Sequence, residues 1–194
     1  MANDNDNKNK DQDLNARVQN ALLDARSVII SGEINQKLAE DVCSKLLVLA
    51  QLGGEPIKVF INSQGGHVEA GDTIHDMLQF VKPRIIMIGT GWVASAGMTI
   101  YLAAEKADRF CLPNTRFLIH QPMGGAQGQA TDIKIEADEI IKMRGRLNRL
   151  IAEATGQPLD RVEKDTLRNY WLNTDEAKEY GILNRVVKKA EEIL

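Results

Sequence analysis

Residues 85–104 read IIMIGTGWVASAGMTIYLAA, a stretch without a charged residue and with a single serine, Ser95. The isoleucine-rich run at 85–88 is typical of a buried strand, and residues 98–104 have the composition of a buried helix. Glycine and alanine surround Ser95, and small residues let other backbone segments approach it closely. A serine at a sharp turn between a strand and a helix lies beside the free backbone N–H groups of the first helical turn. We therefore interpret Ser95 as a candidate nucleophile.

Two other interpretations of this stretch stay open from its residues alone. A serine between two alanines can serve plain packing, and because position 93 is Val93, the match to the G-x-S-x-G motif is incomplete. The length of the stretch would also just suffice for a membrane-spanning helix. Its three glycines, two threonines and one serine make such a helix unfavourable.

The overall composition is typical of one globular domain. The chain has 194 residues, a hydrophobic content of 43% and a formal net charge of −3, which suffices for one core. Because basic residues are not in excess, the composition argues against nucleic acid or an anionic membrane as a partner. Cys43 and Cys111 lie far apart in apolar segments, which favours buried thiols over a disulfide. We expect no metal and no cofactor, because no cluster of His, Cys or carboxylates has ligand spacing.

The N-terminal residues differ from the rest of the chain. Residues 2–13 read ANDNDNKNKDQD and contain no large apolar residue. This composition predicts a disordered polar tail over residues 1–13 and a single folded domain over residues 14–194. The segment also lacks the apolar run of a signal peptide, which indicates a cytoplasmic protein.

Beyond the tail, the sequence alternates strands with helices, the pattern of a parallel sheet. Strands are expected at residues 27–31, 57–61 and 85–88, and Asn35 is a candidate cap for the helix that follows the first strand. The glycine pair at positions 65 and 66 should form a loop before the next helix. In open parallel sheets, ligand sites lie at the carboxyl ends of strands, where both this loop and Ser95 are expected.

A fourth strand, at residues 116–119, places His120 at its end, the best position for a general base among the three histidines. Residues 131–155 then have helical periodicity and predict a helix about 37 Å long. Such a helix should project from a small domain, and its apolar stripe would need another subunit. A long, partly solvated helix on a monomer is the alternative.

Five segments together resemble the ClpP family, the proteolytic subunit of the ATP-dependent Clp protease. They are INSQGG at residues 61–66, GWVASAG at 91–97, RFCLPN at 109–114, IHQPMGGAQGQATDI at 119–133 and KDTLRNYWLNTDEAKEYGI at 164–182. The resemblance implies an α/β, crotonase-like fold with parallel sheets, flanking helices and a projecting handle at about residues 121–156. It also implies a serine endopeptidase that forms two stacked seven-membered rings and cleaves unfolded proteins with low sequence selectivity. An AAA+ unfoldase would feed substrates to these rings.

The resemblance assigns roles to residues at matching positions. Ser95 would attack the scissile carbonyl, and His120 would take its proton. The backbone N–H groups of Gly66 and Ala96 would hold the oxyanion.

Further family positions lie in the handle and near the ring interface. The glycine-rich part of the handle would form a strand and bind extended peptide through its backbone at Gly124, Gly125 and Ala126. Residues at the interface between the rings would be Gln129, Thr131 and Arg168.

One departure from the family pattern concerns the catalytic residues. The third catalytic residue of the family is an aspartate, and Asn169 stands at that position. An asparagine carbonyl can accept a hydrogen bond from His120, but it carries no charge to stabilise an imidazolium. We therefore predict weak intrinsic activity, with Asp165 and Asp175 as less well placed substitutes for the missing acid.

Two further departures concern assembly. Leu167 stands where the family usually has an acid that pairs with the arginine across the ring interface, so Arg168 lacks that partner. The polar residues 2–13 replace an apolar segment that contacts the ATPase in the family, which argues against direct docking of the ATPase by this subunit.

Three functional classes follow from these observations. The first is an active serine peptidase, and the second is a structural or regulatory subunit with little catalysis. In either case the departures resemble a divergent second ClpP paralogue, able to work in a mixed ring with a conventional one. The third is a crotonase-type acyl-CoA enzyme, which would explain Gly66 but leave Ser95 and His120 without a role.

Overall fold

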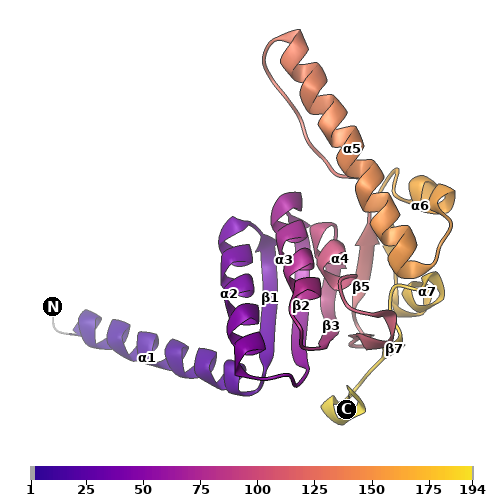
Figure 1. Cartoon of the computed structure of the whole chain (residues 1–194). Helices are drawn as coiled ribbons and strands as arrows, with labels where there is room; N and C mark the ends of the chain where they lie inside the picture. The colour runs from indigo at the N-terminus through magenta and orange to yellow at the C-terminus, as the bar shows by residue number, and fades with distance from the viewer. Residues whose placement is uncertain (1–2, 194) are drawn as a thin grey trace.

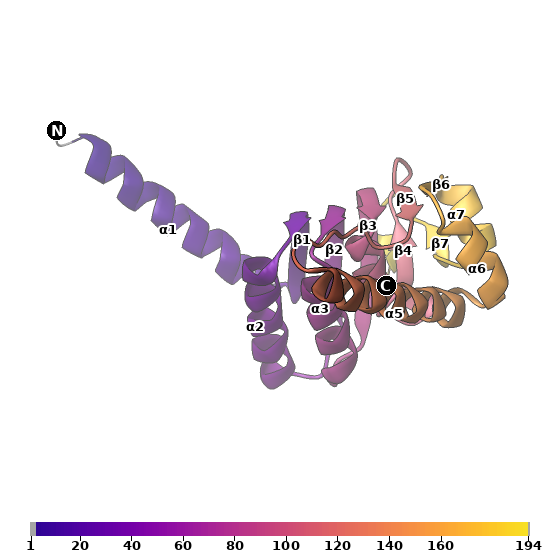
Figure 2. The same ribbon diagram turned by 90° about the horizontal axis from the view of Figure 1, so that it is seen from above.

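The computed structural model describes the backbone of residues 3–193 and the side chains of residues 14–193. A central sheet lies beside a layer of helices, and two long helices, α1 and α5, project from the body in different directions (Figure 1). Figure 2, seen from above, shows α2 and α3 on the same side of the strands.

From α1 to α4, helices and strands alternate along the chain. The α-helices are α1 (Asn3–Asp24), α2 (Gln36–Leu52), α3 (Val68–Phe80), α4 (Ala96–Tyr101), α5 (Ala130–Thr155), α6 (Leu159–Asp165) and α7 (Thr174–Tyr180). The strands are β1 (Ser27–Ile34), β2 (Ile57–Gly66), β3 (Ile85–Ala94), β4 (Arg109–Cys111), β5 (Arg116–Ile119), β6 (Tyr170–Leu172) and β7 (Arg185–Val186). Two short 3₁₀ helices are η1 (Lys106–Asp108) and η2 (Ala190–Ile193).

The sheet forks along β3. Its main path has the order β1-β2-β3-β4-β7, and β5 pairs with both β3 and β6. Met87, Ile88 and Gly89 pair with β4, whereas the later residues of β3 pair with β5. All of these pairs are parallel except β5 with β6, which is antiparallel. The predicted α/β fold with a largely parallel sheet is therefore confirmed, and β6 adds an antiparallel edge.

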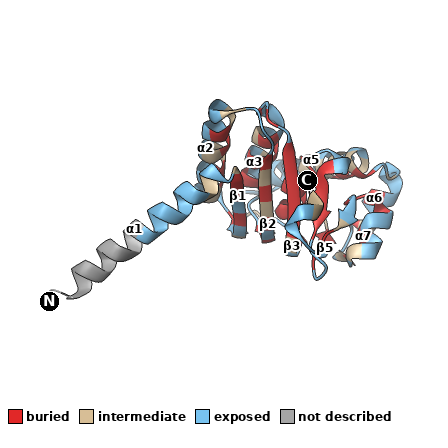
Figure 3. Ribbon diagram, turned by 90° about the horizontal axis from the view of Figure 1, so that it is seen from below, coloured by how far each residue is buried: buried red, intermediate tan, exposed pale blue. Residues whose placement is uncertain are grey.

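The core lies between the sheet and the helices that cover it. Val59 and Ile61 of β2, Leu46 of α2 and Ile74 of α3 are all 0% exposed. Figure 3 shows buried residues concentrated on the strands, whereas most of the described part of α1 is exposed. Asn35 caps α2 as predicted, because its side chain accepts the backbone N–H of Leu38 at 2.9 Å.

Three strands are longer than the sequence predicts. We expected strands to end at residues 31, 61 and 88, but β1 continues to Ile34, β2 to Gly66 and β3 to Ala94. The ladder between β2 and β3 accommodates this extension by a register shift between Ile61 and Ser63. Glycine makes the extension possible, since it adopts positive φ at low cost. The glycine pair therefore lies at the end of a strand rather than in a separate loop.

Helix α5 projects from the body as predicted (Figure 1). Residues 130–139 are all exposed, whereas Asn148, Ile151 and Thr155 near its end are buried. Its outer part therefore presents apolar side chains to solvent in the single chain, including Ile133 and Ile135. That another subunit covers them stays a prediction.

The N-terminal helix reaches further than expected. Helix α1 runs back to Asn3, into the segment for which the polar composition predicts disorder. The domain division at residue 13 stays a prediction. Within residues 3–193, no helix combines the length and apolarity that a membrane span requires. Residues 85–104 instead fold as β3 and α4, which removes the membrane interpretation of that stretch.

Candidate active site

Ser95 lies in the turn between β3 and α4. Its backbone has φ 55° and ψ −122°, a conformation that non-glycine residues rarely adopt. Two hydrogen bonds hold it there: Ser95 N–H donates to the carbonyl of Leu118 at 3.1 Å, and its own carbonyl accepts the N–H of Met98 at 2.8 Å. Such a conformation persists only where the surroundings impose it, and it is concentrated at functional sites. The side chain of Ser95 is partly exposed at the predicted strand-to-helix turn.

The glycine pair of β2 packs directly against this turn. A Cβ at Gly65 would lie 2.6 Å from the Cβ of Ser95 and 3.2 Å from the N of Ala96. A Cβ at Gly66 would lie 2.2 Å from the carbonyl oxygen of Ile34. Both glycines also have positive φ, at 99° and 153°. The close approach of β2 to Ser95 therefore requires glycine at position 65, and the packing of β2 against Ile34 of β1 requires glycine at position 66.

Ser63 fixes the path of this glycine pair. It is 0% exposed, its Oγ donates to the carbonyl of Gly32 at 2.6 Å, and the same Oγ accepts the N–H of Gly65 at 3.0 Å. The hydroxyl thus joins β1 to the segment that packs on the serine turn. Sequence reasoning missed Ser63, although it lies within the INSQGG segment.

His120 and Asn169 meet because of the register between β5 and β6. Ile119 pairs with Tyr170, so the next positions in this antiparallel register are His120 and Asn169. Asn169 Oδ1 lies 3.1 Å from His120 Nδ1. Because the amide oxygen only accepts, this contact requires a proton on Nδ1, which leaves Nε2 of a neutral ring free to accept one.

Ser95 and His120 line one narrow pocket with Pro122 from the following segment. Its other walls are mostly apolar and come from α3, α4, β5 and α5: Val68, Ala96, Met98, Thr99, Ile119, Leu147 and Ile151. No hydrogen bond among the described residues joins Ser95 Oγ to His120. Such contacts often tighten only when substrate binds.

The two acids that could have replaced the missing aspartate are placed elsewhere. Asp165 Oδ2 accepts the hydroxyl of Tyr180 at 3.0 Å and lies 3.5 Å from Nε of Arg161. Burial, and then the hydrogen bond to Asp165, raise the pKa of Tyr180 above its ordinary value. Asp175 lies in the first turn of α7. Of these three residues, Asn169 alone forms a hydrogen bond with His120 among the described contacts.

The expected peptide-binding residues lie in the segment between β5 and α5. Residues 120–127 form no regular element in the single chain, where the resemblance implied a glycine-rich strand. The segment runs outward alongside α5 to its first turn (Figure 1), and a Cβ at Gly124 would lie 2.8 Å from Cδ1 of Ile140. Gly125 has open space around it, and Ala126 is half-buried.

The expected interface residues lie in two segments, the start of α5 and the loop after α6. Gln129 precedes α5 without a side-chain cap bond, and Thr131 lies in the exposed first turn of that helix. Arg168 is exposed beside Asn169. The structure therefore does not bring the three together in one chain.

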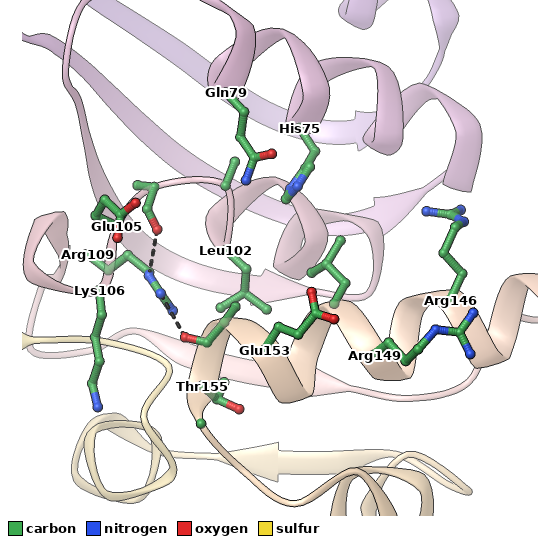
Figure 4. A pocket seen from close by; sticks show the side chains of 15 residues that line it. His75, Gln79, Leu102, Glu105, Lys106, Arg109, Arg146, Arg149, Glu153 and Thr155 are labelled. Carbon is green, nitrogen blue, oxygen red and sulfur yellow. Dashed lines mark hydrogen bonds between the residues drawn. The ribbon is translucent and has the colours of Figure 1, made fainter.

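A larger pocket lies between α3, the end of α4 and the last turns of α5 (Figure 4), and none of the predicted site residues lines it. Arg109, 3% exposed, forms part of its wall. Its guanidinium donates to the carbonyls of Ala104 at 2.9 Å, Ala154 at 2.8 Å and Ile182 at 3.1 Å. Burial lowers the pKa of Arg109. Arg109 therefore ties together the chain at the ends of three helices, a structural role that the sequence did not reveal.

An aromatic cluster joins the strands that carry the site. The rings of Trp92 and Trp171 stack with centroids 6.4 Å apart and an interplanar angle of 8°. Cζ of Arg116 lies 4.3 Å from the centre of the Trp171 ring. These residues belong to β3, β6 and β5, so the cluster helps to fix the strands that precede Ser95 and His120 and follow Asn169.

The fold and the site together define an α/β protein in which a serine at a strained strand-to-helix turn shares a pocket with a strand-end histidine. The sequence profile of the Clp protease family matches residues 9–190. The ATP-dependent Clp protease proteolytic subunit 3 of Rhizobium johnstonii is 59% identical over 172 residues, which cover 89% of each chain. Proteolytic subunit 2 of Gluconobacter oxydans is 57% identical over 180 residues, which cover 92% of this chain and 81% of the relative.

Solved structures agree with these sequence comparisons. ClpP1 from Listeria monocytogenes is 58% identical, covers 91% of this chain and 99% of its own, and has a TM-score of 0.83. An asparagine-to-aspartate mutant of the same protein has a TM-score of 0.86 at the same identity and coverage. The chain therefore belongs to the Clp protease family, as a proteolytic subunit of the ClpP type. The resemblance stated from the sequence is confirmed.

Proposed function

We propose that this chain is a serine endopeptidase subunit of a compartmentalised, ATP-dependent Clp protease. The observation that carries the proposal is the shared pocket of Ser95 and His120 beside the strained serine turn. Ser95 Oγ attacks the scissile carbonyl while Nε2 of His120 takes the hydroxyl proton. His120 then gives this proton to the leaving amine, and water repeats the sequence to release the acyl group from Ser95.

The oxyanion of the tetrahedral intermediate is held by the backbone N–H groups of Gly66 and Ala96. Ala96 opens α4, where an N–H group has no carbonyl partner within the helix. The close packing of Gly65 on Ser95 supports a role for the adjacent Gly66, because it brings the end of β2 to the nucleophile.

Asn169 makes this a weak enzyme when the subunit acts alone. In serine proteases of the chymotrypsin type, exchanging the triad aspartate for asparagine lowers kcat by about 10⁴, through loss of the correct histidine tautomer. Here the oxygen of Asn169 faces Nδ1 of His120, which keeps the productive tautomer. Only the negative charge that would stabilise the imidazolium is missing.

Substrate and assembly follow the family. Unfolded protein and peptide bind through the backbone of residues 124–126 with low sequence selectivity. The subunits form heptameric rings that stack as a tetradecamer in the cytoplasm, with Gln129, Thr131 and Arg168 at the ring interface, and an AAA+ unfoldase supplies substrate. The exposed isoleucines of α5, among them Ile133 and Ile135, support such a subunit contact.

A second candidate function is a structural or regulatory subunit with little catalysis, in a mixed ring with a conventional paralogue. Asn169 favours it, and so does Leu167, which is 46% exposed where the family has an acid. The numbered names of the relatives, subunits 2 and 3, support the existence of more than one paralogue. Membership in the Clp protease family argues against the third class, an acyl-CoA enzyme.

The test compares the purified chain with its Asn169→Asp variant on a short fluorogenic peptide, with particle mass recorded for both. We expect a gain of roughly 10- to 100-fold at unchanged mass, because the variant restores the charge beside a correctly oriented ring. A serine-reactive fluorophosphonate should label both proteins, and Ser95→Ala should abolish the label. If neither protein hydrolyses peptide or is labelled, even with a conventional partner ring, the chain is a structural subunit.

A further inference from the structure

The catalytic pair lies just beyond the end of a short ladder. The pairing of β5 with β6 stops at Ile119 and Tyr170, so it does not include His120 and Asn169. His120 is half-buried and Asn169 is exposed, and one hydrogen bond joins their side chains. A neutral amide attracts the histidine less strongly than a carboxylate would. Other residues must therefore hold His120 and Asn169 in position.

Gln121, which follows His120, makes two contacts with the segment that precedes Asn169. Its backbone N–H donates to the carbonyl of Thr166 at 2.7 Å, and its Nε2 donates to the carbonyl of Leu167 at 2.8 Å. The loop that carries Asn169 is therefore attached to the His120 segment on both sides. The pairing of Ile119 with Tyr170 holds one side, and the hydrogen bonds of Gln121 hold the other. These contacts restrict how far His120 and Asn169 can move apart.

Thr166 is in turn fastened to α5. It is 0% exposed, and its hydroxyl proton is shared between two acceptors, Oδ1 of Asn148 at 2.9 Å and the carbonyl oxygen of Val162 at 2.8 Å. Asn148 is 2% exposed and belongs to the inner part of α5. Because leaving either polar group unpaired in the interior is unfavourable, this pair fixes the end of α6 against α5. Asn148 and Thr166 therefore provide a rigid base for the contact with Gln121.

We propose that Gln121, Thr166 and Asn148 are positioning residues for the catalytic pair. They set the distance and angle between His120 and Asn169, and thereby keep the proton on Nδ1 of His120. The catalytic consequence rests on the proposed function, whereas the hydrogen bond of His120 can be measured independently of activity.

The test uses two variants that each remove one link. Thr166→Val removes the buried hydroxyl at nearly unchanged shape, and Gln121→Met removes the amide at a partly exposed position. Thr166→Ser keeps the hydroxyl and serves as the conservative rescue. The matched control is Thr155→Val, because Thr155 is also buried, at 6% exposure, but its Oγ1 donates to the carbonyl of Ile151 within α5.

Two readouts separate positioning from general stability. The first is peptide hydrolysis, together with the rate at which a fluorophosphonate labels Ser95. We expect Thr166→Val and Gln121→Met to lower kcat and the labelling rate about tenfold while KM changes less than about twofold, since misplacement of a catalytic group acts on the chemical step. Thr166→Ser and Thr155→Val should both keep the rates of the unmodified chain.

The second readout is the imidazole ¹⁵N spectrum of the three histidines, measured on the whole protein. The His120 signals should shift in Thr166→Val and Gln121→Met. His75 serves as an internal reference, because it is buried and its Nδ1 lies 2.7 Å from the carbonyl of Thr99. Its signals should not move.

The proposal is overturned if folded Gln121→Met leaves both the His120 signals and the labelling rate unchanged, or if Thr155→Val changes them equally. Gln121→Met decides the outcome if Thr166→Val fails to fold. If Ser95 is never labelled in any variant, the proposed peptidase function fails. The His120 spectra then still decide whether these residues position the pair.

Discussion

The two halves of the candidate site are built in different ways. The Ser95 half consists of buried backbone, where glycine and alanine pack so closely that a single added Cβ would overlap the turn. The His120 half lies at the antiparallel edge of the sheet, where exposed or half-buried side chains meet through hydrogen bonds. We expect the first half to fix which chemistry is possible. We expect the second half to set the rate of that chemistry, which single substitutions can change.

The largest effect should come from removing the nucleophile. In the Asn169→Asp background, which offers more activity to measure, Ser95→Ala should lower kcat by about 10⁶, as loss of a catalytic serine does elsewhere. Particle mass and the urea midpoint should stay close to those of the parent. Residual hydrolysis well above this level would show that another residue attacks the substrate. It would contradict the assignment of the nucleophile to the Ser95 half of the site.

A smaller but still large effect should follow from crowding the serine turn. Gly65→Ala places a Cβ 2.6 Å from that of Ser95 at a φ of 99°. We expect the labelling rate of Ser95 to fall about 10²-fold and the free energy of unfolding to fall by about 2–4 kcal/mol. Gly54→Ala is the matched control, because a Cβ there meets no atom within 4 Å. Equal effects of the two changes would contradict the rigidity of this half.

Relief of backbone strain should give a moderate gain in stability, separate from the loss of activity that removal of the Ser95 hydroxyl causes. Ser95→Gly frees the residue at φ 55° and should raise the free energy of unfolding by about 1 kcal/mol. Ser95→Ala keeps the Cβ, and its free energy of unfolding should lie within about 0.5 kcal/mol of that of the parent. Urea denaturation of the three proteins measures both values. If the free energy of unfolding is higher for Ser95→Ala than for Ser95→Gly, the turn stores no strain.

The smallest effect should come from the nearby acid that does not reach His120. Asp165→Asn keeps an acceptor for the hydroxyl of Tyr180 and loses the ion pair with Arg161. We expect peptidase activity to stay within about twofold, and the free energy of unfolding to fall by less than about 1 kcal/mol. A large loss of activity in steady-state assays would instead give Asp165 a part in the His120 half of the site.

Local sequence patterns were sufficient to predict the backbone around Ser95, whereas its role as a nucleophile stays a prediction. Alternating strand and helix patterns give the parallel sheet, and small residues around Ser95 indicate a tight turn, so both could be predicted from short segments. The ends of the strands could not be predicted in this way. Glycines normally end a strand, but β2 continues through its glycine pair after a register shift.

The partners within the His120 half depend on the topology of the whole chain. Asn169 could be assigned only from a family resemblance, because it lies 49 residues from His120 in the sequence. The contacts of Gln121 with Thr166 and Leu167, and that of Asn148 with Thr166, carry no local signal either. The antiparallel pairing of β6 brings these segments together, and short-range periodicity does not predict such a pairing.

The separation of His120 and Asn169 along the chain also sets the order in which the protein becomes competent. Ribosomes deliver the N-terminal part first, so β1 to β5 and the Ser95 turn can form while β6 has not yet been made. Closing the pair requires α5 and α6 to be complete, and this long loop adds an entropic cost to the step. In a nascent chain, the Ser95 turn can therefore form before Asn169 holds His120. The complete candidate site arises only once nearly the whole polypeptide has been synthesised.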